Sequence, residues 1–210
     1  HRSSRGWSYG GGVTDPRTGE ILKGKVTLGS LRVRQDYLIA QALAGNFDAA
    51  NPENAVLMDM ALARMRQLAA HEVGHTLGLP HNYIASAKGL SSVMDYPHPY
   101  LSIKNGAIDL SNAYDEGIGS WDIVAIKMAY SSIPEGLEEQ EVMDQWVSEY
   151  LAQGLDFLSD KDARPAGSAH PKTHLWDNGT DPVAQLAHVL EVRKLALDDF
   201  GLKNISKGMP

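Results

Sequence analysis

The chain carries the stretch His71-Glu72-Val73-Gly74-His75-Thr76-Leu77-Gly78-Leu79-Pro80-His81. Residues four apart on an α-helix project from the same face, about 6 Å apart along the axis. The two histidines at 71 and 75 can therefore share one metal ion, since imidazole nitrogens bind zinc at about 2.0–2.1 Å. Gly78 permits the sharp turn that would return His81 to the same ion. Three imidazoles leave a fourth position for water, as in catalytic zinc sites.

Glu72 stands next to the first histidine but about 100° further round the helix. That position keeps its carboxylate near the ion without binding it, which suits a general base acting on metal-bound water. Two histidines at this spacing alone are more often surface residues than ligands. Glutamate, glycine and a third histidine at fixed offsets rarely coincide by chance, and Val56–Ala70 supplies the helix that the pattern requires.

A short β-part is expected before the histidines. Residues 6–19 are rich in glycine and carry the turn-like Asp15-Pro16-Arg17-Thr18-Gly19, and residues 20–28 alternate as a strand does. A helix is expected over 30–44. A second one should begin at Asn51-Pro52 and run to Leu77, because Gly78 suits a left-handed cap and Pro80 cannot continue a helix.

The remaining chain is expected to be mostly helical. Residues 85–112 are interrupted by Pro97 and Pro99 and are predicted to be mostly irregular. Ser120 is predicted to cap a helix over 121–130. Two further helices are predicted near 136–152 and 181–199, the last beginning at Asp181-Pro182.

Composition excludes several classes of function. The 210 residues carry a formal net charge of -7 and no cysteine. Nucleic-acid binding driven by phosphate neutralisation, disulfide scaffolds, thiolate zinc sites and cysteine nucleophiles are therefore not expected. No apolar run approaches the roughly 20 residues needed to cross a bilayer. The chain begins without Met or an apolar leader, so we expect it to be part of a larger precursor.

The histidine stretch resembles the extended zinc signature His-Glu-x-x-His-x-x-Gly-x-x-His of the metzincin metalloproteases. Met94, thirteen residues after His81, fits the methionine turn beneath the metal in that clan, here Ser91-Ser92-Val93-Met94-Asp95-Tyr96. More narrowly, residues 78–86 (Gly-Leu-Pro-His-Asn-Tyr-Ile-Ala-Ser) and 92–97 (Ser-Val-Met-Asp-Tyr-Pro) resemble the catalytic portion of bacterial Met-zincin-type zinc-dependent metalloproteases.

The resemblance implies an α+β, zincin-like metalloprotease fold. Its parts would be a short N-terminal sheet, an active-site helix and a mostly helical C-terminal part. Few strands precede the expected edge strand, so part of the N-terminal sheet is expected to be missing or supplied elsewhere. Residues 1–130 would form the catalytic core, and residues 131–210 a helical subdomain packed on it. A secreted, periplasmic or cell-envelope location follows from the resemblance alone.

The implied activity is that of a zinc endopeptidase with one catalytic Zn2+ held by His71, His75 and His81, and with Glu72 as general base. Tyr96 is similar to a tyrosine that ligates zinc or supports the oxyanion in related branches; a wall residue is the equal alternative. Asp15–Ile21 resembles the turn and edge strand that bind an extended peptide substrate as an added strand. An ordinary hairpin edge is the alternative there.

Other candidates are weaker. Four further histidines lie outside ligand spacing and are expected on the surface or in loops: His98, His170, His174 and His188. A calcium site among Asp109, Asp115, Glu116 and Asp122 has no EF-hand pattern behind it, so solvated acids are the favoured interpretation. Two functions compete with the peptidase. One is a zinc-containing peptide-binding module without turnover, or a fragment inactive without its missing sheet. The other, a structural zinc site, is disfavoured by three ligands without a thiolate.

Overall fold

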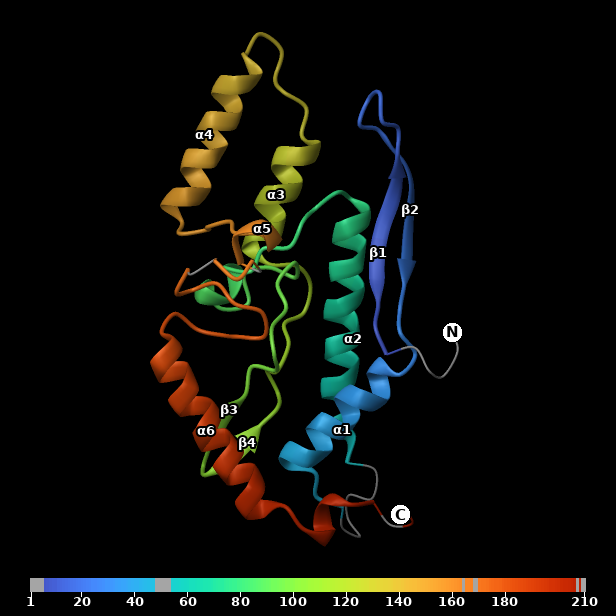
Figure 1. The fold of residues 1–210 in the computed structure, drawn as a ribbon, viewed down its shortest axis with the longest axis vertical. Coiled ribbons are helices and arrows are strands. Elements are labelled where there is room, and N and C mark those ends of the chain that lie inside the picture. The colour runs from blue at the N-terminus through green and yellow to red at the C-terminus, as the bar shows by residue number, and fades with distance from the viewer. Residues whose placement is uncertain (1–5, 48–53, 164, 168–169, 207, 209–210) are drawn as a thin grey trace.

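The structure is a computed structural model that describes residues 6–47, 54–163, 165–167, 170–206 and 208 (Figure 1). Its strands are β1 (Tyr9–Thr14), β2 (Ile21–Thr27), β3 (Ser102–Lys104) and β4 (Ala107–Asp109). Its α-helices are α1 (Arg32–Ala44), α2 (Ala55–Thr76), α3 (Ser120–Tyr130), α4 (Glu139–Ala152), α5 (Asp160–Ala163) and α6 (Pro182–Asp199). Two 3-10 turns, η1 (Ala85–Lys88) and η2 (Leu202–Asn204), complete an α+β fold.

Helix α2 runs through the middle of the molecule (Figure 1). The antiparallel β1–β2 hairpin packs along one side of it, and α1 packs near its N-terminal end. On the other side lie the mostly irregular segment 79–119 and the C-terminal helices (Figure 1). The spacing of apolar residues along α2 explains why this helix is central. Leu57, Met60, Ala61 and Leu68 recur at helical intervals and are buried against the neighbouring elements.

Two apolar clusters hold the elements around α2. The first joins α1 and the start of α2 to residues 110–114 through Ala40, Leu57, Met60, Leu110, Ala113 and Tyr114. The second joins the turn at Met94 to α3 and to the chain after α4, through Val93, Met94, Trp121 and Leu155. The second cluster also packs against Ala70 and Leu79, which border the histidine segment, and so helps to fix the position of that segment in the fold.

Most predicted elements are confirmed. The strand predicted over 20–28 is β2, and the helices predicted over 30–44, 136–152 and 181–199 are α1, α4 and α6. Asp181 caps α6 by accepting from the backbone N–H groups of Val183 and Ala184. The predicted helix start at Asn51-Pro52 lies outside the described residues; the described part of α2 begins at Ala55.

Three local predictions were wrong or incomplete. The glycine-rich segment contains a strand, β1, that glycine's low strand propensity conceals. Segment 85–112 contains the small β3–β4 hairpin, whose turn residues Asn105 and Gly106 both have positive φ. Ser120 is not the cap of α3. Gly119 holds that position, and its N–H donates to the carboxylate of Asp122 at 2.7 Å. The division of the chain at residue 130 stays a prediction.

Candidate metal centre

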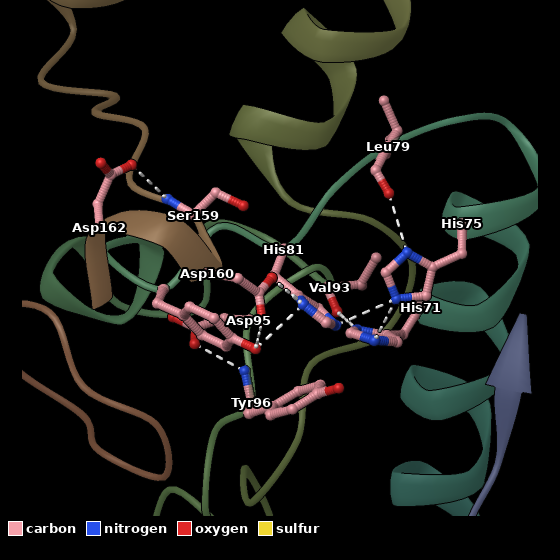
Figure 2. A network of polar contacts seen from close by, with 11 residues as sticks. His71, His75, Leu79, His81, Val93, Asp95, Tyr96, Ser159, Asp160 and Asp162 are labelled. Carbon is pink, nitrogen blue, oxygen red and sulfur yellow. Dashed lines mark hydrogen bonds and ion pairs between the residues drawn. The ribbon is translucent and has the colours of Figure 1, made fainter. Parts of the chain in front are cut away.

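The three histidines of the motif meet at one point. His71 and His75 project from the last turns of α2, which ends at Thr76. Gly78 then adopts a φ of +86°, as the motif predicts, and the N–H of Leu79 donates back to the carbonyl of Gly74 at 3.0 Å. This turn returns the chain so that His81 faces the helix (Figure 2).

The facing atoms are the three Nε2 nitrogens. Nε2 of His75 lies 3.1 Å from Nε2 of His71 and 3.2 Å from Nε2 of His81. Three nitrogens bound at 2.0–2.1 Å around a tetrahedral zinc would lie about 3.3 Å from one another. Among the described residues, no other group of three or more His, Asp or Glu side chains is spaced to hold an ion.

The second nitrogen of each ring fixes its tautomer. Nδ1 of His71 lies 2.6 Å from the carbonyl of Val93, and Nδ1 of His75 lies 2.9 Å from the carbonyl of Leu79 (Figure 2). Nδ1 of His81 lies 2.6 Å from a carboxylate oxygen of Asp160. Carbonyls and carboxylates accept, so each Nδ1 carries the proton and each Nε2 presents a lone pair. Three lone pairs aimed at one point fit a divalent cation.

His71 is suited to metal binding by its surroundings. Its side chain is buried, and this burial lowers the pKa of the imidazole from 6.5 to about 3; the hydrogen bond to Val93 acts in the opposite direction. The neutral form therefore persists at physiological pH. Only that form offers a lone pair to a metal ion.

Two side chains that support the histidines, Asp160 and Gln67, were not predicted from the sequence. Asp160, on α5, accepts from His81 and also from the hydroxyl of the buried Tyr83 at 3.3 Å. Gln67 donates to the carbonyl of Val93 at 3.2 Å, the same oxygen that His71 uses, and Arg64 hydrogen-bonds to Gln67. These contacts orient the rings that carry the candidate ligand atoms. No short-range pattern marks Asp160, which is 79 residues from its partner.

Glu72 is buried at the junction of α2 and β1. Burial raises the pKa of its carboxyl group, whereas the nearby His75 and the backbone N–H of Gly10 lower it. Gly10 lies so close that a Cβ there would stand 2.0 Å from the carbonyl oxygen of Glu72. Glycine is therefore needed at this point of β1, and β1 delivers a hydrogen-bond donor to the Glu72 side chain.

Met94 and Tyr96 lie against the histidines. Met94 is fully buried under α2, where a Cβ at position 74 would stand 2.3 Å from its sulfur. The ring of Tyr96 contacts His81 and His71, with centroid distances of 4.7 and 5.3 Å (Figure 2). The loop after α5 reaches the same place, because the ring of Trp176 stacks on Tyr96 at 5.2 Å.

The other sequence candidates lie apart from this cluster. His98 and His188 contact loop carbonyls, and His170 contacts Thr173. His174 likewise contacts the carbonyl of its neighbour, Leu175.

Three of the four acids considered for calcium have other partners in the described structure. Asp122 accepts from Ser92, from the N–H of Val93 and from that of Gly119. Asp109 pairs with Lys104 and bonds Ser102 and Ser111. Asp115 accepts from the N–H of Glu116. The prediction that these acids are solvated is wrong for Asp122, whose side chain is buried. Asp115 and Glu116 are exposed, as the prediction requires.

The fold and the three-histidine cluster define the class of a zincin-type metalloprotein. A family model described as Met-zincin matches residues 53–210, most of the chain, and the protein belongs to that family. The match includes the motifs at 71–97 and extends over the C-terminal 80 residues, which carry no distinctive motif of their own. No curated protein and no solved structure matches the chain.

Within the described residues, no helix is both long and apolar enough to cross a membrane. The secreted, periplasmic or cell-envelope location stays a prediction from resemblance.

Proposed function

We propose that this Met-zincin is a zinc-dependent endopeptidase whose ligands are His71, His75 and His81. One observation carries the proposal: three imidazole Nε2 atoms converge at 3.1 and 3.2 Å while an acceptor holds each opposite Nδ1. Three nitrogen ligands with a fourth position left to water are typical of catalytic zinc sites.

The chain's own groups would divide the reaction among them. Zinc, when bound, supplies a Lewis acid that acidifies a bound water and polarises the peptide carbonyl. The Glu72 carboxylate takes the proton from the attacking water and then delivers it to the leaving amine nitrogen. Burial of Glu72 favours the protonated form in the second step, and the N–H of Gly10 holds the carboxylate in place.

Tyr96 is proposed to act at the same point. Its ring contacts two of the three histidines, which puts the side chain beside the candidate metal centre. A hydrogen bond from that hydroxyl to the developing oxyanion would stabilise the transition state. A wall residue without chemistry is the alternative. Replacement by Phe separates the two, because only the first role loses turnover.

An extended peptide is the proposed substrate. The β1–β2 hairpin lies along α2, and in the described structure each of its strands pairs only with the other. An open strand edge beside the candidate metal centre can add a peptide strand through main-chain hydrogen bonds. The net charge of -7 argues against a polyanionic substrate.

The test joins metal analysis to proteolysis. The protein purified without chelator is expected to hold about one zinc per chain and to cleave casein, and a chelator should stop cleavage. Glu72→Gln should keep the zinc and lose cleavage by a factor of about 1,000 or more. Asp59→Asn changes an exposed acid on the same helix and serves as the matched control. Full activity in Glu72→Gln would refute the proposed base.

A peptide-binding module without turnover is the second candidate. Because the sheet beside α2 has only two strands in the described structure, a metal centre that binds peptide but does not cleave it is also consistent with the fold. Such a module would hold zinc and bind peptide equally well in the wild-type chain and in the Glu72→Gln variant. The buried carboxylate beside the histidines favours the enzyme, since binding alone gives no reason to bury an acid there.

A further inference from the structure

We propose that Trp176 forms a substrate-binding subsite with Tyr96 that selects a large apolar or aromatic side chain of the bound peptide. The inference rests on the proposed function and names its substrate class. Trp176 lies in the loop between α5 and α6 and stacks on Tyr96, with an interplanar angle of 24°. Tyr96 in turn contacts His71 and His81, so an indole ring borders the candidate metal centre.

The indole is exposed although its neighbours are anchored. Its side chain keeps 54% of its accessible surface. The chain around it is fixed: the N–H of Trp176 donates to the carbonyl of Tyr96 at 2.9 Å, and Ser86 donates to the carboxylate of Asp177 at 3.0 Å. Asn178 donates to the carbonyl of His98 at 3.1 Å. An exposed aromatic ring on a pinned loop is therefore preorganised for contact with a ligand.

The backbone of Trp176 is strained. Its φ is 65°, in the left-handed region that bulky residues avoid. The two other non-glycine residues with positive φ among those described are asparagines, which tolerate this region. Strain of this kind persists where the surrounding contacts enforce it, and it clusters at binding and catalytic sites. The indole that this backbone positions stacks on Tyr96 but stays 54% exposed, so its packing is incomplete.

The chemistry of the subsite favours an apolar guest. One face of the indole is covered by Tyr96, and a second aromatic or branched aliphatic side chain can stack against the exposed part. A lysine or arginine side chain would also be attracted by an aromatic face. The histidines contacting Tyr96 would hold a divalent cation nearby, and its charge opposes such a guest.

The experiment measures binding and cleavage separately. Fluorescein-labelled peptides Gly-Ala-Ala-X-Ala-Ala-Gly, with X as Phe, Leu, Ala or Lys, are titrated into zinc-loaded Glu72→Gln protein and followed by fluorescence anisotropy. The same peptides are offered to the zinc-loaded wild-type chain, and their cleavage is followed. The Phe and Leu peptides should bind about tenfold more tightly than the Ala peptide. Cleavage of the Phe peptide by the wild-type chain should exceed that of the Ala peptide by a similar factor.

Variants locate the preference. Trp176→Ala should reduce the Phe-to-Ala binding ratio to about one, and Trp176→Phe should restore most of it. Trp176→Gly also removes the ring, and glycine adopts the positive φ without strain. It therefore replaces the alanine variant if that variant fails to fold. Trp7 is also exposed, at 66%, and Trp7→Ala is the matched control that should keep the ratio.

Each result supports or overturns the subsite. The subsite is overturned if the Phe-to-Ala binding ratio is unchanged in Trp176→Ala and Trp176→Gly. It is also overturned if the four peptides bind equally well to the zinc-loaded Glu72→Gln protein that retains Trp176. A preference for the Lys peptide that disappears with Trp176 overturns the apolar class. Tight Phe binding that depends on Trp176, without any cleavage by the wild-type chain, keeps the subsite and refutes the endopeptidase.

Discussion

Asp160 and His81 form a hydrogen bond of 2.6 Å, from Nδ1 of the imidazole to Oδ2 of the carboxylate, across 79 residues of chain. The carboxylate comes from α5, a helix of four residues that follows α4. Because a ligand histidine is oriented by the acceptor on its other nitrogen, the C-terminal part of the chain helps to define the candidate metal centre. The centre therefore needs both halves of the sequence.

Asp160→Ala is predicted to weaken zinc binding about 10–100-fold, because the third imidazole loses the acceptor that fixes its tautomer and orientation. Competition with a fluorescent zinc chelator measures the change. Asp160→Asn keeps an acceptor oxygen and should recover much of the affinity. Asp162→Ala, on the same turn of helix, is the control, since this acid accepts from the N–H of Ser159, at 3.4 Å, and not from a histidine. Equal zinc affinity in the two alanine variants would contradict the prediction.

Gly74 and Met94 are predicted to be coupled in stability. Gly74→Ala alone should destabilise the fold by about 1–3 kcal/mol, because the new Cβ would stand 2.3 Å from the sulfur of the fully buried Met94, so that side chain must shift within the core. In Met94→Ala protein the same change should be neutral or stabilising by up to about 1 kcal/mol, since alanine is the better helix former. Urea unfolding of the four proteins measures the coupling. If the effects of the two substitutions on the free energy of unfolding were additive, the contact between position 74 and Met94 would not contribute to stability.

The candidate ligands could be predicted from the sequence because their geometry is local. His71, His75 and Glu72 share one helix, and Gly78 sets the turn before His81, so fixed spacing determines their approach. The start of α6 could also be predicted from a local signal, because Asp181 caps the helix and Pro182 is its first residue.

The rest of the site depends on contacts between distant segments. Asp160 and Trp176 carry no periodic signal. The path of the C-terminal chain brings Asp160 to His81 and Trp176 to Tyr96. Strand β1 was missed because its glycines have low intrinsic strand propensity. Gly10 is needed for its close approach to Glu72, a requirement that exists only once α2 and β1 are packed together.

Asp95 gives a pH dependence of stability that is separate from the histidines. Burial raises the pKa of its carboxyl group to about 6, from 3.8, although the N–H groups of Ser86 and Tyr96 lower it. Ionisation therefore costs more in the folded chain than in the unfolded one. The stability that this group contributes is fully present below about pH 4 and is lost as pH rises through about 6, amounting to about 3 kcal/mol.

Asp95→Asn should remove that dependence. The free energy of unfolding of the wild-type chain, minus that of the variant, should fall by up to about 3 kcal/mol between about pH 4 and about pH 7.5. Urea unfolding of metal-free protein measures it, and the subtraction cancels the titration of the histidines. A difference that stays constant over this range would show that Asp95 ionises as easily in the folded chain as in the unfolded one.

Gly10 and Gly11 offer the sharpest test of how the hairpin serves Glu72. A Cβ at position 10 would stand 2.0 Å from the backbone oxygen of Glu72, whereas a Cβ at position 11 meets no atom within 4 Å. Gly10→Ala must therefore lift β1 from α2, which removes the N–H that holds the Glu72 carboxylate. Casein cleavage should fall at least about tenfold, and amide exchange in β1 and β2 should quicken. Gly11→Ala should leave both unchanged, because alanine fits the strand there. Full activity in Gly10→Ala would mean that Glu72 works without the hairpin.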